Sequence, residues 1–328
     1  MLSPNLNLNQ DVFLSEVEKK SNREGFGEGL LFAGEKFSEI VVLCNDLASS
    51  TKSDLFAKKF PKRFVQMGIA EQNMIGVAAG MAIEGKIPYA VSHAIFNPSR
   101  NWDQIRISVA LSNLNVKIVG THSGFSNGRD GAVAESLEDV ALMRVIPKMI
   151  VVEPIDAFQA EKAVQALAEY QGPAYLRISK ETTPLITTKE TPFEIGKAYV
   201  LVEGRDITIV SSGPITYEAL LAVKELKAKY GIEAEVIACP TIKPIDEETL
   251  LFSVKKTGKA LVLQEHQIIG GLGSAVAELF SQKYPVKLAM VGMKDSFGES
   301  GGYQELKDKY GLNSHNIVNE VISLIGKK

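Results

Sequence analysis

The chain has 328 residues, of which 45% are hydrophobic and 23% charged, and its formal net charge is −3. This length predicts about two domains, and the near-neutral charge gives no broad attraction to nucleic acid or membrane surfaces. No apolar run of about 18 residues could span a bilayer, and the N-terminus lacks the basic-then-apolar order of a secretory signal.

The first half of the chain alternates between expected helices and strands. After a polar leader over residues 1–20, the pattern predicts a helix over 23–37 and an apolar strand that ends at Asp46. Further helices are expected over 70–85, 101–113, 136–146 and 157–171, and further strands over 87–94, 116–123, 149–154 and 174–179. Continuous apolar strands alternating with helices indicate a parallel sheet covered on both faces.

Residues 181–196 interrupt this rhythm. They are rich in Thr, Pro and Lys without a sustained period, which predicts a linker. Beyond them, strands are expected over 206–213, 234–240, 259–265 and 286–292, with helices over 217–231 and 273–284. We therefore predict an α/β fold with two parallel- or mixed-sheet domains covered by helices, over residues 21–180 and 197–328.

Glu71 is the first candidate for a functional residue. It lies in "MGIAEQNMIG" (67–76), at the expected first turn of the helix over 70–85. An ionised carboxylate is costly to bury without a partner, so two interpretations stay open: an exposed helix start, or a buried residue of a site. Gly76 and Gly80 in the same helix predict close backbone packing, and its apolar character predicts burial, also at a subunit contact.

Several polar residues follow the expected strands. Asp46, His93 and His122 each come at the end of one, and ligands bind at the carboxyl ends of parallel strands. The loop over 121–131 is long, rich in glycine and charged, and it includes Asp130. Taken alone, this loop is more typical of a flexible surface turn than of a site.

Other groups give weaker signals. Arg23, Arg177 and Lys180 are isolated cations, for which a solvated surface position is the commoner interpretation. Cys44 and Cys239 lie in separate apolar runs, which predicts two buried thiols and a reducing, cytoplasmic setting. The four histidines show no spacing typical of metal ligands.

Three motifs together indicate a family. The stretches "NDLASS" (45–50), "MGIAEQNM" (67–74) and "WDQIR" (102–106) resemble the C-terminal section of transketolase. That section comprises a pyrimidine-binding domain and a C-terminal domain, and the likeness extends from about Arg23 to the end of the chain. The resemblance implies a thiamine-diphosphate pyrimidine-binding fold followed by a transketolase C-terminal domain.

The resemblance implies thiamine diphosphate as the cofactor. In the family, the carboxylate matching Glu71 hydrogen-bonds a ring nitrogen of the aminopyrimidine and favours the tautomer that removes the thiazolium proton. Phe96 matches the aromatic residue that stacks on the pyrimidine, and Asp46 matches an acidic residue beside the cofactor. His93 stands where the family commonly has a second aromatic residue, usually Phe.

The substrate side matches the family only in part. The matching positions are Arg23, Ser50, His122 and Asp130. In transketolases, the residues matching Arg23, Ser50 and His122 hold the sugar-phosphate tail, and the residue matching Asp130 contacts a sugar hydroxyl. His122 is also a candidate catalytic residue, together with Glu71. Ala134 stands where a substrate-contacting His is expected, and Lys180 replaces an Arg of the tail site, which removes bidentate geometry. The donor and acceptor sugars therefore stay open.

The resemblance also implies a partner. Full-length transketolases begin with a diphosphate-binding domain, whose Gly-Asp-Gly motif and downstream Asn bind Mg²⁺ or Ca²⁺. Here the only similar string, "GRDG" (128–131), lies in the loop over 121–131. We therefore expect a split enzyme, in which an N-terminal subunit supplies the diphosphate and metal ligands. The expected assembly is a heterotetramer that contains a homodimer of this chain.

The sequence thus predicts the catalytic subunit of a split transketolase that moves a two-carbon ketol unit between phosphorylated sugars. One alternative is another thiamine enzyme subunit, similar to deoxyxylulose-phosphate synthase or to the beta subunit of a 2-oxo acid dehydrogenase. "GIAEQNM" (68–74) favours transketolase over both. A second alternative is a noncatalytic scaffold subunit, against which the intact Glu71, Phe96, Asp46 and His122 argue.

Overall fold

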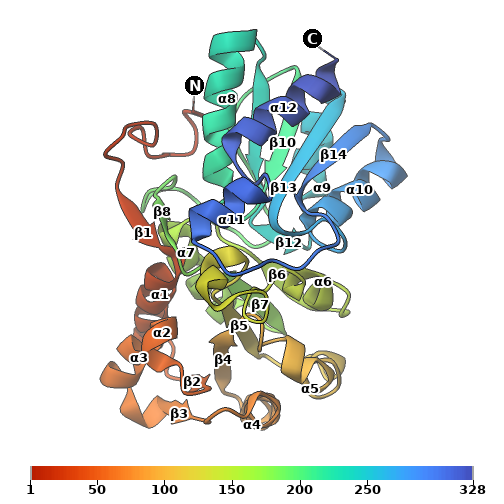
Figure 1. The fold of residues 1–328 in the computed structure, drawn as a ribbon. Coiled ribbons are helices and arrows are strands. Elements are labelled where there is room, and N and C mark those ends of the chain that lie inside the picture. The colour runs from red at the N-terminus through yellow and green to blue at the C-terminus, as the bar shows by residue number, and fades with distance from the viewer. Residues whose placement is uncertain (1, 327–328) are drawn as a thin grey trace.

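Two β-sheets with helices on both faces organise residues 2–326, the part of the chain that the computed structural model describes (Figure 1). A seven-stranded sheet lies in the lower lobe of Figure 1 and a five-stranded sheet in the upper lobe. Alternate residues of a strand pack into different cores, so that Val42 belongs to one cluster and Val41 and Leu43 to another. The predicted α/β fold with two sheet domains is confirmed.

The lower sheet has the strand order β12-β6-β7-β5-β4-β2-β3. Its strands are β2 (Ile40–Cys44), β3 (Phe64–Gln66), β4 (Ile87–His93), β5 (Lys117–Thr121), β6 (Ile150–Val152), β7 (Ala174–Ile178) and β12 (Thr241–Lys243). The pairs are parallel apart from β12 with β6, which is antiparallel. Because β12 follows β11 of the upper sheet in sequence, this strand joins the two lobes.

The helices of the lower lobe flank this sheet. They are α1 (Asn22–Lys36), α2 (Ala48–Thr51), α3 (Asp54–Lys59), α4 (Glu71–Ile83), α5 (Trp102–Gln104), α6 (Asp139–Arg144) and α7 (Ala157–Glu169). Short helical turns complete it: η1 (Pro61–Arg63), η2 (Ser99–Asn101), the π-helical η3 (Ile105–Leu111) and η4 (Phe125–Asp130). Ser21 begins α1 with a capping box, because its side chain accepts from the Glu24 N–H while the Glu24 carboxylate accepts from the Ser21 N–H.

The upper sheet has the order β14-β13-β10-β11-β9, with β9 antiparallel to β11. Its strands are β9 (Tyr199–Val202), β10 (Ile207–Ser211), β11 (Ala234–Ala238), β13 (Lys259–Gln267) and β14 (Lys287–Met293). Its helices are α8 (Thr216–Tyr230), α9 (Glu247–Thr257), α10 (Leu272–Lys283), α11 (Tyr303–Lys309) and α12 (Ser314–Ile325). Within residues 2–326, none of the helices combines the length and apolar character that a bilayer crossing requires.

The leader and the linker lie against each other along the side of the molecule. The strand β1 (Lys19–Ser21) pairs antiparallel with β8 (Thr182–Pro184), which lies inside the expected linker. Nearer the N-terminus, the Ser3 N–H donates to the Leu201 carbonyl at 2.7 Å and the Asn9 N–H to the Ile186 carbonyl at 3.0 Å. Both segments therefore contribute ordered backbone contacts that connect the lobes.

Arg177 lies between the lobes, so its expected position on the solvated surface is wrong. It is 1% exposed, its Nε donates to Asp139 Oδ2 at 2.8 Å, and it pairs with Glu153. Its second terminal nitrogen donates to the carbonyl oxygens of Ser136 and, in the upper lobe, Glu265. Although burial opposes it, the Arg177 guanidinium holds the pKa of Asp139 below its usual value. No local pattern indicated this network, because its members are far apart in the chain.

Candidate active site

His93 and His122 stack at the carboxyl ends of neighbouring strands. His93 ends β4, and His122 follows Thr121, which lies beside His93 in the parallel register of β4 and β5. The ring centroids are 3.8 Å apart and the ring planes meet at 25°. The structure thus brings together two predicted site residues that are separated by a helix and a strand in sequence.

Two hydroxyl groups orient this histidine pair. The Ser50 Oγ lies 3.1 Å from His122 Nε2 and 3.4 Å from His93 Nε2, and the Thr121 Oγ1 lies 2.9 Å from His122 Nδ1. Thr121 donates its own proton to the Ser92 carbonyl, so we infer that His122 Nδ1 carries the proton that Thr121 accepts. His122 Nε2 is then the free acceptor, and it faces Ser50.

Both imidazoles are neutral at physiological pH. Burial lowers the pKa of His93 to about 4 and that of His122 to about 2, and the positive charges of Lys180 and Arg23 act in the same direction on both. The carboxylate of Asp130 opposes the shift at His93. The charges of Arg23 and Lys180 therefore act on both imidazoles, and that of Asp130 acts on His93.

Arg23 offers an unused donor beside this pair. Its Nη1 donates to the Ser50 carbonyl at 2.8 Å, which ties the start of α1 to α2. Its Nε is buried and has no hydrogen-bond partner within the described chain. A buried N–H group without a partner is costly, so this nitrogen is suited to an anion that the chain itself does not supply.

Asp46 and His122 share an unusual backbone conformation. Their φ angles are +59° and +58°, in the left-handed region that costs a non-glycine residue about 1–2 kcal/mol. Such strain is concentrated at functional sites. The Asp46 N–H donates to Gln66 Oε1 at 2.7 Å, which anchors this exposed residue to the end of β3.

Glu71 is buried, so the exposed interpretation is excluded. Glu71 is the first residue of α4 and is 6% exposed. One carboxylate oxygen accepts from Arg100 Nη1 at 3.1 Å, and the Asn101 side chain donates to the Glu71 carbonyl at 3.2 Å. The basic partner that a buried carboxylate needs is therefore present in the chain.

Arg100 connects Glu71 to Phe96. Its guanidinium carbon lies 4.1 Å from the centre of the Phe96 ring, and that ring lies nearly parallel to His93 with a centroid distance of 6.0 Å. Glu71 and Phe96 thus contact the same planar guanidinium, one through an ion pair and the other through its ring face. Sequence reasoning missed Arg100, although its spacing of four residues from Phe96 is one at which helical neighbours meet.

The loop over 121–131 is mostly buried, so the surface-turn interpretation is wrong for most of it. Residues 121–128 are buried, whereas Arg129 and Asp130 are exposed at its end. Ala134, at the position where the family has His, is 7% exposed. The loop is therefore a packed element that presents Asp130.

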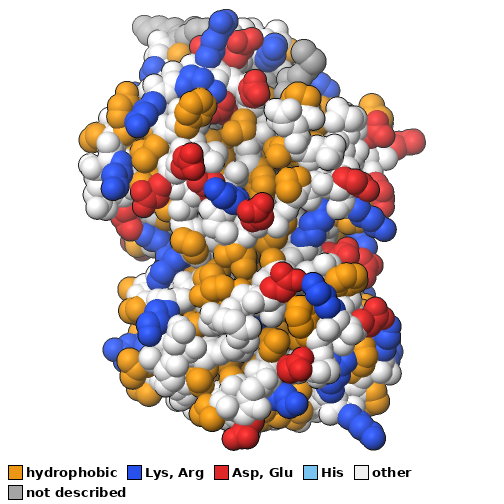
Figure 2. All heavy atoms as spheres, turned by 180° about the vertical axis from the view of Figure 1, so that it is seen from behind, with side chains coloured by type: hydrophobic (Ala, Val, Ile, Leu, Met, Phe, Trp, Pro, Cys, Tyr) orange, Lys and Arg blue, Asp and Glu red, His pale blue; other side chains and the backbone are white. Residues whose placement is uncertain are grey.

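One face of α4 is open, and only the other is packed in the chain. Met74, Ile75 and Ala78 are buried, whereas a Cβ added at Gly76 or Gly80 would meet no atom within 4 Å. The close packing predicted for these glycines is therefore not found within the chain. Exposed apolar side chains also occur at the two ends of α4, at Ile69 and Ile83, and on η3, which packs against α4, at Ile107 and Leu111. On the side of the molecule seen in Figure 2, hydrophobic side chains also gather where the lobes meet and on the lower lobe.

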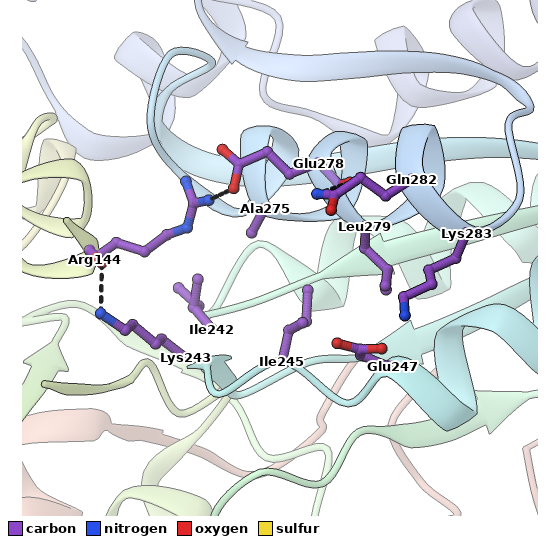
Figure 3. A pocket seen from close by; sticks show the side chains of 10 residues that line it. All are labelled: Arg144, Ile242, Lys243, Ile245, Glu247, Ala275, Glu278, Leu279, Gln282 and Lys283. Atoms are coloured by element: carbon purple, nitrogen blue, oxygen red, sulfur yellow. Dashed lines mark hydrogen bonds and ion pairs between the residues drawn. The ribbon is translucent and has the colours of Figure 1, made fainter. Parts of the chain in front are cut away.

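A separate cavity of about 340 Å³ lies between α6 of the lower lobe and α9, α10 and β12 (Figure 3). Three of its five charged residues are engaged, because Arg144 pairs with Glu278 and the Lys243 ammonium donates to the Arg144 carbonyl at 2.8 Å. None of the predicted site residues lines it. This cavity is thus distinct from the surroundings of Glu71 and of the histidine pair.

The two thiols are buried, and the part of the chain that the structure describes holds no cluster of metal ligands. Cys44 and Cys239 are free and buried as predicted, and burial raises the pKa of Cys239 to about 12 and that of Cys44 above its usual value. Across residues 2–326, no group of three or more His, Cys, Asp and Glu side chains is arranged to hold a metal ion.

Comparisons with known proteins cover nearly the whole chain. Two family models match: "Transketolase, pyrimidine binding domain" over residues 18–185 and "Transketolase, C-terminal domain" over residues 196–317. The 6-deoxy-6-sulfo-D-fructose transketolase subunit SqwH of Clostridium sp. (strain MSTE9) is 42% identical over 306 residues, which are 93% of this chain and 95% of that protein.

Two further proteins are similar at comparable coverage. A subunit of the apulose-4-phosphate transketolase of Phocaeicola vulgatus is 35% identical over 306 residues, 93% of this chain and 97% of that protein. A solved structure named "Split gene transketolase, inactive beta4 tetramer" matches with a TM-score of 0.88 and 45% identity, over 93% of this chain and 98% of that one.

Proposed function

Since the chain belongs to the transketolase family, we propose that it is the catalytic subunit of a split, thiamine-diphosphate-dependent transketolase. The proposed reaction moves a two-carbon ketol unit from a ketose to an aldose. The observation that carries this proposal is that the buried Glu71 carboxylate and the Phe96 ring contact one and the same planar N–H donor, the Arg100 guanidinium.

Glu71 and Phe96 fit an aminopyrimidine. Arg100 contacts both residues with a planar group that carries N–H donors, and an aminopyrimidine has the same two properties. Thiamine diphosphate, when bound, supplies an electron sink for breaking and forming the carbon–carbon bond. Glu71 would hold a proton on the ring nitrogen, Phe96 would orient the ring, and Arg100 would move aside.

The histidine pair would handle the sugar. His122 Nε2 is an acceptor, and Ser50 and Thr121 hold its ring in one tautomer. Burial is the main cause of the low histidine pKa values, and an anionic tail between Arg23 and Lys180 would neutralise the two charges that lower them further. Binding of the substrate would therefore weaken the electrostatic part of this lowering.

The tail of the sugar is proposed to be a phosphate or a sulfonate. The buried Arg23 Nε without a partner in the described chain supports an anion of this kind. The similar proteins are named for a sulfo-sugar in one case and for a sugar phosphate in the other, which supports a tail site that varies within the family. Lys180 and Ala134 are the positions at which the specificity of this chain would differ.

The partner is proposed to be an N-terminal subunit that holds the diphosphate and its Mg²⁺ or Ca²⁺. Two relatives are named as subunits, and the similar structure is named a split gene transketolase in an inactive tetramer. The open, glycine-lined face of α4 beside Glu71 supports a subunit contact there. We propose a cytoplasmic heterotetramer with two copies of this chain.

The test is reconstitution with the N-terminal subunit, followed by a screen of phosphorylated and sulfonated ketose donors against aldose acceptors. Ketol transfer is expected from the complex and not from the isolated chain. Glu71→Gln should lower turnover at least about 100-fold, whereas Glu84→Gln, at the exposed end of the same helix, should not. Full activity of the isolated chain, or of the Glu71→Gln complex, would overturn the proposal.

A further inference from the structure

The substrate loop over 121–131 rests on the upper lobe through its glycines. A Cβ at Gly124 would lie 2.1 Å from Glu265 Oε1, and one at Gly128 would lie 2.3 Å from Leu306 Cδ1. A Cβ at Gly131 would lie 2.6 Å from Ser300 Oγ. The glycine-rich composition that suggested a flexible turn therefore reflects close packing against the other lobe.

Glu265 makes the polar part of this contact. It lies near the end of β13, is 5% exposed, and its Oε1 accepts from the Phe125 N–H at 2.7 Å. Its Oε2 accepts from the Tyr303 hydroxyl at 2.8 Å, so both carboxylate oxygens are satisfied. Although burial raises the pKa of Glu265, the Tyr303 hydroxyl and the Phe125 amide hydrogen-bond its charged form. The hydrogen bond to Phe125 crosses directly from the upper lobe into the loop.

Two further contacts hold the same loop. The Gly301 N–H donates to the Gly128 carbonyl at 3.0 Å, and the Phe125 ring stacks on Tyr310 with a centroid distance of 5.3 Å. These attachments lie between His122, a member of the histidine pair, and Asp130, whose charge acts on His93. The upper lobe therefore holds the part of the loop that connects these two residues.

We propose that the upper lobe fixes the substrate loop, with Glu265 as the positioning residue that holds the segment between His122 and Asp130. Glu265 touches no predicted substrate position and acts through the Phe125 backbone. The proposal assigns the C-terminal domain a role in sugar binding. The role of Asp130 in contacting the sugar rests on the proposed function, whereas the attachment of the loop to the upper lobe is independent of that function.

The direct test is hydrogen exchange of the full-length chain, read by mass spectrometry in a peptide that covers 122–131. Glu265→Ala should accelerate exchange in this peptide about tenfold, because one charged hydrogen bond to the backbone is lost. Glu265→Gln keeps a carbonyl acceptor and should restore slow exchange. The matched control is Glu235→Ala, which removes an equally buried carboxylate from the same sheet, away from the loop.

Kinetics of the reconstituted complex test the effect on sugar binding. Glu265→Ala should raise KM about tenfold and change kcat less than about twofold, because the reacting groups stay in place while the sugar contact is misplaced. If Glu265→Ala does not fold, Gly128→Ala replaces it, since the added methyl group would push the loop away from Leu306.

The proposal is overturned if the 122–131 peptide of Glu265→Ala exchanges as slowly as that of the parent chain, or at the same rate as that of Glu235→Ala. It is also overturned if loop exchange rises while KM does not. A complex without ketol transfer would refute the proposed function, and the exchange result would still decide whether Glu265 fixes the loop.

Discussion

The neutral histidine pair predicts a specific acid sensitivity, which His93→Phe should reduce. The folded pKa values of His93 and His122 are about 4 and about 2, below the usual value of 6.5. Below pH 6.5 the unfolded chain therefore binds protons that the folded chain excludes, so the free energy of unfolding falls as the pH falls through this window. The substitution His93→Phe keeps an aromatic ring at position 93, between His122 and Phe96, and removes one titrating group.

The size of the effect follows from the pKa of His93. Between pH 7.5 and pH 5, His93 lowers the free energy of unfolding by about 1–2 kcal/mol, the lower figure allowing for solvent screening of a partly exposed ring. His93→Phe should remove this part of the pH-dependent loss in the free energy of unfolding. Burial raises the pKa of Glu135 to about 7, so Glu135 changes stability in the opposite direction, equally in both proteins.

The measurement is urea denaturation at the two pH values, followed by Trp102 fluorescence. Trp102 is the single tryptophan, and its indole donates to the Leu142 carbonyl at 2.8 Å in the same lobe as the histidines. Each protein serves as its own reference, because the change between the two pH values is compared. Equal losses in the parent and in His93→Phe would refute the assignment of His93 as a buried neutral group.

Three further predictions concern the buried network, the open helix face and the thiols. Arg177→Met leaves Asp139 and Glu153 buried without their cation, and it should lower the free energy of unfolding by about 3–5 kcal/mol. A loss below about 1 kcal/mol in urea denaturation would contradict this role. Gly80→Ala should stabilise the isolated chain by up to about 1 kcal/mol, whereas Gly80→Leu should block assembly with the partner. Light scattering after size-exclusion chromatography measures the second effect, and normal assembly of Gly80→Leu would argue against a contact at α4. Cys44 and Cys239 should react with a thiol reagent only after denaturation, and rapid labelling of the native chain would be inconsistent with their burial.

Local patterning predicted the fold class and most strands of the two large sheets, but it missed β3, β9 and β12 and the helices α9, α11 and α12. Periodicity alone predicted the buried strands and the helix that begins near Glu71, because apolar patterning repeats along the chain. It also placed Asp46, His93 and His122 after strands, and parallel strands bring such residues to one edge of a sheet. The family motifs then predicted the roles of these residues.

Which charges have partners became known only from the folded chain. Arg177 and Arg100 are indistinguishable from surface cations in sequence, yet one joins the lobes and the other pairs with Glu71. These pairs join residues 24 or more positions apart, and no local pattern encodes such contacts. The same holds for the loop over 121–131, whose glycines predicted mobility and proved to be sites of close approach. Burial and pairing depend on what the rest of the chain places opposite a residue, and that is settled when the two lobes pack.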